Sequence, residues 1–300
     1  MESTGKYWIR VHDTLEESGL NTLLANPLKT RIIAQARLKD DTLDSNALAD
    51  LLWADLVYES FVPDREHREL RHIARCRIDL VQRRTQFKNK VHAILAKYEF
   101  DCDHDLFSKK GMHWLKSIDF LSWSDKMAID SYVAILETME GEVESFTKKI
   151  ASISLHDESV KLLMTIPGID YVTALTVITE IVDIKRSPTP WKLVAYSGLA
   201  PSRRDSGNTT TTGMRITKQG SAWMRCAVVE AATTTIQLDE RLGRFYRRIA
   251  GRRGPQKAKV ATAKEMLVII WHMLTRNEKS RTMDREAVER KYKKLAWMAS

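Results

Sequence analysis

The stretch from Leu163 to Arg225 reads LMTIPGIDYVTALTVITEIVDIKRSPTPWKLVAYSGLAPSRRDSGNTTTTGMRITKQGSAWMR. It opens with an Ile-Pro-Gly-Ile turn, residues 166–169, between two apolar segments. Such a turn is typical of a helix-hairpin-helix, in which backbone N–H groups at a helix N-terminus can bind a phosphate, here around Gly168. An ordinary connection between two helices would have the same pattern.

The second half of this stretch is polar and basic. From Pro201 to Gly220 it consists mainly of hydroxyl side chains, cations and glycines, so it predicts an exposed loop. Residues 185–225 hold eight Lys or Arg and one acidic residue, Asp205. The local potential therefore attracts anions, of which a phosphodiester is the obvious example.

The charge of the whole chain is uneven. Its 300 residues carry a net charge of +9, but residues 1–63 have a net charge of −4 and residues 241–300 one of +12. This favours a nucleic-acid partner for the middle and end of the chain, which is long enough for about two domains. Cys76, Cys102 and Cys226 are scattered and have no CxxC spacing, so the sequence suggests neither a disulfide framework nor a zinc site, which fits a protein of the reducing cytoplasm. The chain has no signal pattern and no apolar run long enough to span a membrane.

The N-terminal part predicts short elements. A helix from Tyr7 to Ser18, a buried strand at 22–25, a helix at 31–36 and an amphipathic helix from Asp41 to Val57 follow one another. Asp41 and Asp44 stand three apart at the start of the last helix. Both would complement exposed N–H groups as capping residues, or both would bind one divalent metal from the same face.

Two long segments predict an arm. Residues 64–99 form a basic helix with Arg77 and Arg84 in its apolar seam, and residues 132–153 keep a regular spacing of apolar positions. They predict an antiparallel coiled-coil arm, or two amphipathic helices packed on the body. Cys102 and His104 between them have no further ligands nearby and are interpreted as structural or surface residues rather than a metal site.

The C-terminal part predicts buried helices around a basic segment. Residues 223–237 and 261–274 are apolar enough to be core, and residues 276–300 predict a charged, partly exposed tail. Between them, residues 241–259 mix cations with Phe245 and Tyr246, a combination that can bind a nucleic-acid backbone and stack on bases.

Several spaced motifs resemble the Piv-related, DEDD-motif transposases of bacterial insertion sequences, the group described as bridge-RNA-guided recombinases. The resemblance covers nearly the whole chain. Its motifs are Met1-Glu-Ser-Thr-Gly-Lys-Tyr-Trp8, Asn26-Pro27, Lys39-Asp-Asp-Thr-Leu-Asp44, Ile166-Pro-Gly-Ile169, Ala195-Tyr-Ser-Gly-Leu-Ala-Pro201, Ser206-Gly207 and Ile216-Thr-Lys-Gln-Gly220.

The resemblance implies a mainly α chain with a small α/β part. Residues 1–63 would be part of an RNase H-like, RuvC-type catalytic domain, residues 64–157 the coiled-coil arm, and residues 158–300 a helical transposase domain with the hairpin and a catalytic serine loop. The implied partners are DNA, a structured guide RNA and further copies of the chain.

The resemblance also implies the site residues. Glu2, Asp41 and Asp44 match three of the family's four acidic residues, which bind Mg²⁺, so metal binding becomes the preferred interpretation of the two aspartates. Ser206 matches a serine nucleophile that forms a covalent intermediate with DNA. The cations Arg203, Arg204, Arg215 and Lys218 would hold the phosphate.

From composition alone, Ser206 is expected to be a turn residue before Gly207. Ser197, the rival serine, has apolar neighbours that suggest packing, and the threonines at 209–212 more readily contact phosphate or solvent.

One departure from the family concerns its first Asp, which lies upstream of the glutamate, whereas this sequence begins one residue before Glu2. An N-terminally truncated member is therefore expected. Two alternatives to a serine recombinase follow: an inactive nucleic-acid-binding relic, and a RuvC-like metal-dependent nuclease that uses water.

Overall fold

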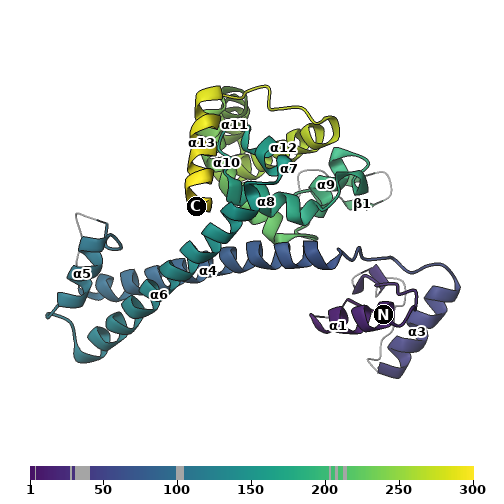
Figure 1. Cartoon of the computed structure of the whole chain (residues 1–300), viewed down its shortest axis with the longest axis horizontal. Helices are drawn as coiled ribbons and strands as arrows, with labels where there is room; N and C mark the ends of the chain where they lie inside the picture. The colour runs from purple at the N-terminus through teal and green to yellow at the C-terminus, as the bar shows by residue number, and fades with distance from the viewer. Residues whose placement is uncertain are drawn as a thin grey trace. The chain divides into compact units, whose positions relative to one another are not determined.

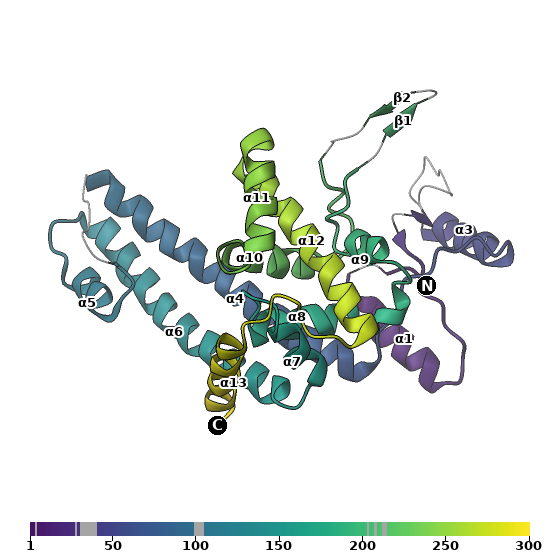
Figure 2. The ribbon, with the colours of Figure 1, turned by 90° about the horizontal axis from the view of Figure 1, so that it is seen from above.

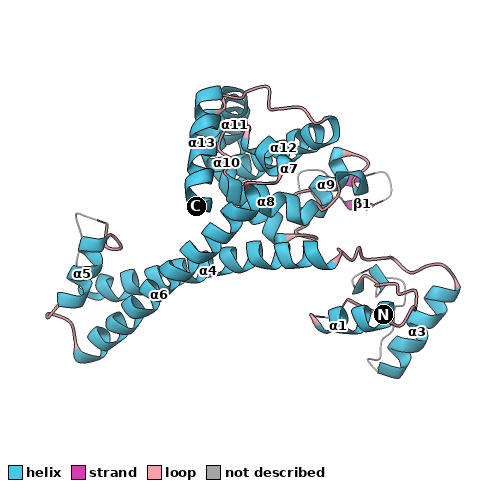
Figure 3. Ribbon diagram, in the orientation of Figure 1, coloured by secondary structure: helices cyan, strands magenta, loops and turns pink. Residues whose placement is uncertain are grey.

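The computed structural model describes residues 1–3, 5–27, 29–30, 41–98, 105–202, 204–206, 209–211 and 215–300. Of residues 41–44, 47, 204–206 and 209–211 it describes the backbone alone. In these ranges the chain is mainly helical, and its one sheet has two strands (Figure 3). The chain divides into two compact units, Met1–Asp64 and Arg65–Ser300.

The first unit is built on three short extended segments. Ala25 bridges in parallel to Glu2 and antiparallel to Glu59, and its N–H donates to the carbonyl of Met1 at 2.7 Å. Leu24 and Ala25 are buried, because they form the middle segment of the three. The predicted strand at 22–25 is thus reduced to bridging at a single residue.

Two helices of this unit have described bounds, α1 (Tyr7–Glu17) and α3 (Asp41–Trp53). α1 follows the prediction closely. α3 ends four residues before the predicted Val57, because Asp55 takes a left-handed conformation with φ of 53°. The helix predicted at 31–36 lies outside the described residues.

In the second unit, α4 (Arg65–Leu95) and α6 (Trp123–Ser154) run antiparallel, with η1 (Ala96–Tyr98) and α5 (Lys109–Ser117) between them in sequence (Figure 1). Both seam arginines reach across to α6. Arg77 Nε donates to Thr147 Oγ1 at 2.7 Å, and Arg84 Nη1 to Glu140 Oε2 at 2.6 Å. Cys102 and His104 lie outside the described residues.

The remaining helices pack around one apolar core. They are α7 (Glu158–Met164), α8 (Tyr171–Ile181), η2 (Ile184–Arg186), α9 (Pro190–Tyr196), α10 (Ala222–Leu238), α11 (Glu240–Arg253), α12 (Pro255–Arg276) and α13 (Arg285–Ala299). Their fully buried side chains include Leu163, Ile169, Leu175, Met224 and Leu242. The prediction of a partly exposed tail at 276–300 misses α13, whose Leu295 is buried in this core.

The helix ends follow from local sequence. Asp170, Ser221 and Asp239 accept hydrogen bonds from backbone N–H groups in the first turns of α8, α10 and α11. Pro190 and Pro255 lie in the first turns of α9 and α12, where a missing N–H costs nothing. These caps fix where the connecting loops leave the core.

Candidate functional site

The predicted serine loop is a β ribbon. Its base joins residues 198–202 to 215–218, with Pro201 bridged to Ile216. Ser202 donates its N–H and its hydroxyl to the Arg215 carbonyl at 2.9 and 2.6 Å. Farther out, β1 (Arg204–Ser206) pairs antiparallel with β2 (Thr209–Thr211), and both project from the helices of this unit (Figure 2).

Ser206 pairs with Thr209, in the last pair before the connection at 207–208. Of Ser206 and Arg204 the structure describes the backbone, and Arg203 lies outside the described residues. The predicted cations Arg215 and Lys218 are both exposed at the base of the ribbon. The backbone therefore carries Ser206 outward from a base where two predicted phosphate-binding residues lie.

Two glycines let the ribbon base pack closely on the helices. Gly198 has φ of +70°, and a Cβ there would lie 2.8 Å from the Gln219 carbonyl oxygen. Gly220 has φ of +111°, and a Cβ there would overlap the Tyr196 carbonyl. A side chain at either position would separate the segments 196–201 and 216–220, which explains why both motifs contain glycine.

Ser197 is not a rival nucleophile in this structure. It is fully buried, its hydroxyl donates to the Val194 carbonyl at 2.7 Å, and it accepts from the Leu199 N–H. Ser197 therefore has the packing position that its apolar neighbours predict.

A groove lies between the ribbon base and the α11–α12 corner, with a volume of about 780 Å³. We call it the basic groove. Six cations line it, and none of the described lining residues is acidic: Arg215, Lys218, Arg252, Arg253, Lys257 and Lys264. Its apolar lining consists of Leu199, Pro201, Ile216, Ile249, Val260 and Ala261. The fold thus brings two basic segments, predicted separately from the sequence, into one surface.

Trp191 lies beside the basic groove. Lys264 Nζ is 5.0 Å from the centroid of its ring, and the residue is 60% exposed. Neither Trp191 nor Lys264 was predicted from the sequence as a site residue. A tryptophan directly after Pro190, in a polar segment, was the available signal for an exposed aromatic.

The Ile166–Ile169 turn packs against α10. Gly168 has φ of +88°, and a Cβ there would lie 2.6 Å from the backbone nitrogen of Thr235 in α10. Thr235 Oγ1 donates to the Pro167 carbonyl at 2.8 Å. Packing against α10 explains this glycine, so phosphate binding by the turn stays a prediction.

Lys291 on α13 holds the same turn from another side. Its Nζ donates to the carbonyls of Met164 and Ile166 at 2.7 and 2.9 Å. Burial of the ammonium lowers the pKa of Lys291 to about 8. These two carbonyl groups are therefore already hydrogen-bonded within the protein.

The predicted metal ligands lie in the first unit. Glu2 is half-buried in the segment that bridges Ala25. Asp41 and Asp44 fall at the start of α3, and of these two residues the structure describes the backbone. As a donor set, three carboxylates suit a hard divalent cation such as Mg²⁺.

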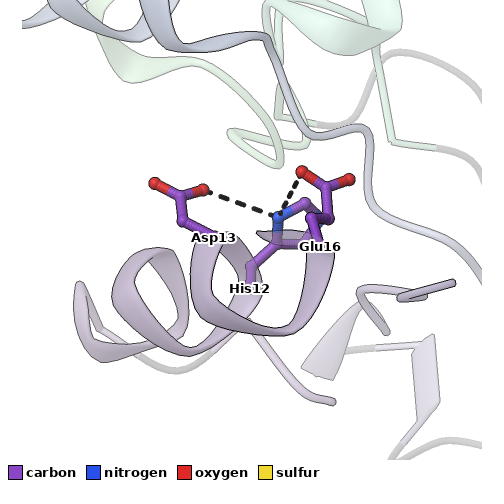
Figure 4. Close-up of side chains that lie close together, drawn as sticks. All are labelled: His12, Asp13 and Glu16. Atoms are coloured by element: carbon purple, nitrogen blue, oxygen red, sulfur yellow. Dashed lines mark ion pairs between the residues drawn. The ribbon is translucent and has the colours of Figure 1, made fainter. Parts of the chain in front are cut away.

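The sequence analysis missed a second cluster, formed by His12, Asp13 and Glu16 on α1 (Figure 4). His12 is 4% exposed, and its Nδ1 lies 3.7 Å from Asp13 Oδ1 and 3.4 Å from Glu16 Oε2. The i, i+4 spacing of His12 and Glu16 was the available signal. The ligand atoms of the three groups lie close enough together to hold one cation.

Among the described residues, no helix has the length and apolarity needed to cross a membrane.

Family comparisons agree on one class of protein. A model of the IS116/IS110/IS902 transposase family matches residues 160–247, and a DEDD transposase model of the IS110 type matches residues 1–100.

Three relatives belong to the same class. The chain is 28% identical over 201 residues to the candidate transposase y4qE of Sinorhizobium fredii, which covers 66% of this chain and 48% of that protein. It is 24% identical over 295 residues to the transposase for insertion sequence element IS1111A of Coxiella burnetii, covering 93% of this chain and 78% of the relative. The transposase for element IS1328 of Yersinia enterocolitica is 23% identical over 288 residues, covering 92% of this chain and 83% of the relative. The chain thus spans about half the length of y4qE and more of the other two. All of these matches are to transposases.

Proposed function

We propose that this relative of the IS116/IS110/IS902 transposases breaks and rejoins DNA through Ser206. The observation that carries the proposal is the ribbon: its outer end carries Ser206, and its base lines the basic groove. The two family matches support the same class of enzyme.

In this proposal the Ser206 hydroxyl attacks a backbone phosphorus. The Oγ–P bond forms and a P–O bond to the DNA sugar breaks. The serine proton leaves to a base, and the sugar oxygen takes up a proton and leaves as a free hydroxyl at the end of the DNA strand. The covalent intermediate keeps the energy of the phosphodiester for rejoining to another strand. The proposed roles of Arg203, Arg204, Arg215 and Lys218 are to hold the phosphate and offset its developing charge.

The proposed metal ligands are Glu2, Asp41 and Asp44. A bound Mg²⁺ would stabilise the attacking and leaving oxygens of such a displacement. One feature of the first unit supports this role: the segment at Glu2 is paired with Ala25, so the Glu2 backbone has a defined position.

The proposed partners beyond DNA are a structured guide RNA and further copies of the chain. The net charge of +12 over residues 241–300 supports a polyanionic partner. A two-DNA reaction supports an oligomer, because two strand pairs have to meet.

The test uses purified protein with labelled target and donor DNA, the candidate guide RNA and Mg²⁺, followed by denaturation. A labelled protein–DNA band that is lost in Ser206→Ala and kept in Ser202→Ala supports the proposal. Ser202 is the matched control, since it lies on the same ribbon four residues earlier. Cleavage that survives Ser206→Ala would instead identify a water-using nuclease, and binding without any strand breakage an inactive nucleic-acid-binding protein.

A further inference from the structure

We propose that the basic groove binds an unpaired strand of nucleic acid and that Trp191 stacks on one of its bases. That the ligand is a nucleic acid rests on the proposed function. The new point is that the bound strand is unpaired.

The charge of the basic groove selects a polyanion. Six cations from two separate segments line one cavity, without an acidic residue among the described lining. Lys218 is fixed there by a left-handed backbone with φ of 54° and by its N–H, which donates to the Gly198 carbonyl at 3.1 Å. The phosphates of a nucleic acid match such a row of cations.

The apolar lining distinguishes an unpaired strand from a duplex. Ile216, Ile249 and Val260, which are all partly exposed, line the same cavity as the cations. A duplex presents phosphates and base edges to a protein, because its base faces are stacked inside. An unpaired strand also presents base faces, which can cover apolar side chains.

Trp191 supplies the stacking surface. Its side chain is 60% exposed, although tryptophan is usually well buried. Trp191 lies in the first turn of α9, beside Lys264 of the basic groove. Lys264 can therefore contact a phosphate while the neighbouring base lies on the indole. Base–aromatic stacking of this kind tolerates any base, so the expected binding has little sequence preference.

The groove also adjoins the ribbon that carries Ser206. Arg215 lines the groove and pairs through its carbonyl with Ser202, two residues before β1. A strand held in the groove is thus anchored at the ribbon base.

The experiment measures fluorescence anisotropy with the full chain carrying Ser206→Ala, without divalent metal. The probes are a labelled DNA strand designed without self-pairing, the RNA strand of the same sequence, and the corresponding DNA duplex. The variants are Trp191→Ala, Trp191→Phe and the control Trp297→Ala, which removes a tryptophan that is 73% exposed on α13. Circular dichroism checks that each variant melts like its parent.

Trp191→Ala should weaken binding of an unpaired strand about five- to a hundredfold and leave duplex binding nearly unchanged. Trp191→Phe should restore most of the affinity, and Trp297→Ala should change none of it. A larger effect on the RNA strand identifies a guide-like ligand, and a larger effect on the DNA strand an opened target. An equal effect on duplex and single strands, or no effect, overturns the inference. Because divalent metal is left out of every binding measurement, the outcome does not depend on whether Ser206 is the nucleophile.

Discussion

Arg75 on α4 and Glu180 on α8 form a bidentate ion pair. Nε lies 2.7 Å from Oε1 and Nη2 2.9 Å from Oε2, and the Glu180 side chain is 1% exposed. Arg71, one turn earlier, donates to the carbonyls of Thr179 and Glu180 at 2.6 and 2.7 Å. These contacts attach the long helix to the core from which the ribbon projects.

Arg75→Met should destabilise the second unit, since it leaves the Glu180 carboxylate buried without its partner. Arg75 is 36% exposed, so we expect a loss somewhat below that of a fully buried pair, about 2–3 kcal/mol. The melting temperature should then fall by roughly 4–12 °C for a unit of this size. Arg83→Met is the control, because Arg83 pairs with Asp79 on the exposed side of the same helix. Equal melting temperatures for the two variants would contradict a structural role for the buried pair.

Gly168→Ala should cost stability and should not act specifically on nucleic-acid binding. The new Cβ would meet Thr235 N at 2.6 Å and Thr235 Cα at 2.9 Å, on a backbone with φ of +88°. We expect a loss on the order of 1–3 kcal/mol in urea unfolding. Gly251→Ala on α11 meets nothing within 4 Å and should be neutral or stabilising by about 0.4–1 kcal/mol. Weaker DNA binding by Gly168→Ala at unchanged stability would instead assign the turn to phosphate.

Replacing Arg252 and Lys257 together by Gln should weaken binding of every nucleic-acid sequence alike. Each lost phosphate contact reduces the slope of log K against log salt by about 0.7 for a single strand, so the pair should reduce it by roughly 1.4. The matched control replaces Lys293 and Lys294, two exposed cations of α13 that do not line the basic groove. A salt titration in which both double variants behave alike would show that the groove is not the interface.

Lys291 should make stability depend on pH. Its pKa is about 8 in the folded chain against an ordinary value of 10.5, so between these values the unfolded chain binds more protons. The free energy of unfolding should therefore rise with pH across this window and lose that contribution as pH falls through 8. The measurement is the difference between the parent and Lys291→Met in urea unfolding, which cancels other titrating groups. A flat difference for Lys291→Met would contradict the lowered pKa.

Local patterns predicted the helices well and the contacts between them poorly. The apolar spacing at 64–99 and 132–153 corresponds to α4 and α6, and the apolar run at 223–237 to α10. Sequence could not show that Gly168 packs on Thr235, because that contact joins residues 67 apart and depends on the tertiary fold. For the same reason, the prediction of a partly exposed tail at 276–300 did not identify Leu295 as a buried residue.

For the candidate site too, individual residues were predicted from the sequence, but the contacts that bring them together were not. The roles of Arg215 and Lys218 were implied by the family resemblance, and the basic segment at 241–259 was predicted separately from its cations and aromatic residues. Their meeting in one groove follows from the packing of the ribbon base on α11 and α12. Trp191 was missed because an isolated aromatic carries no periodic signal, and its exposure is known only from the fold.

The most direct test of the account identifies the residue that becomes linked to DNA. The denatured protein–DNA adduct is digested with nuclease and trypsin, which should release the peptide Asp205–Arg215 with a nucleotide attached. This peptide contains Ser206 and the threonines at 209–212, so fragmentation in the mass spectrometer separates the rival nucleophiles. The account predicts the nucleotide mass on Ser206. A nucleotide on one of the threonines or on another peptide, or strand exchange without any linked peptide, would contradict it.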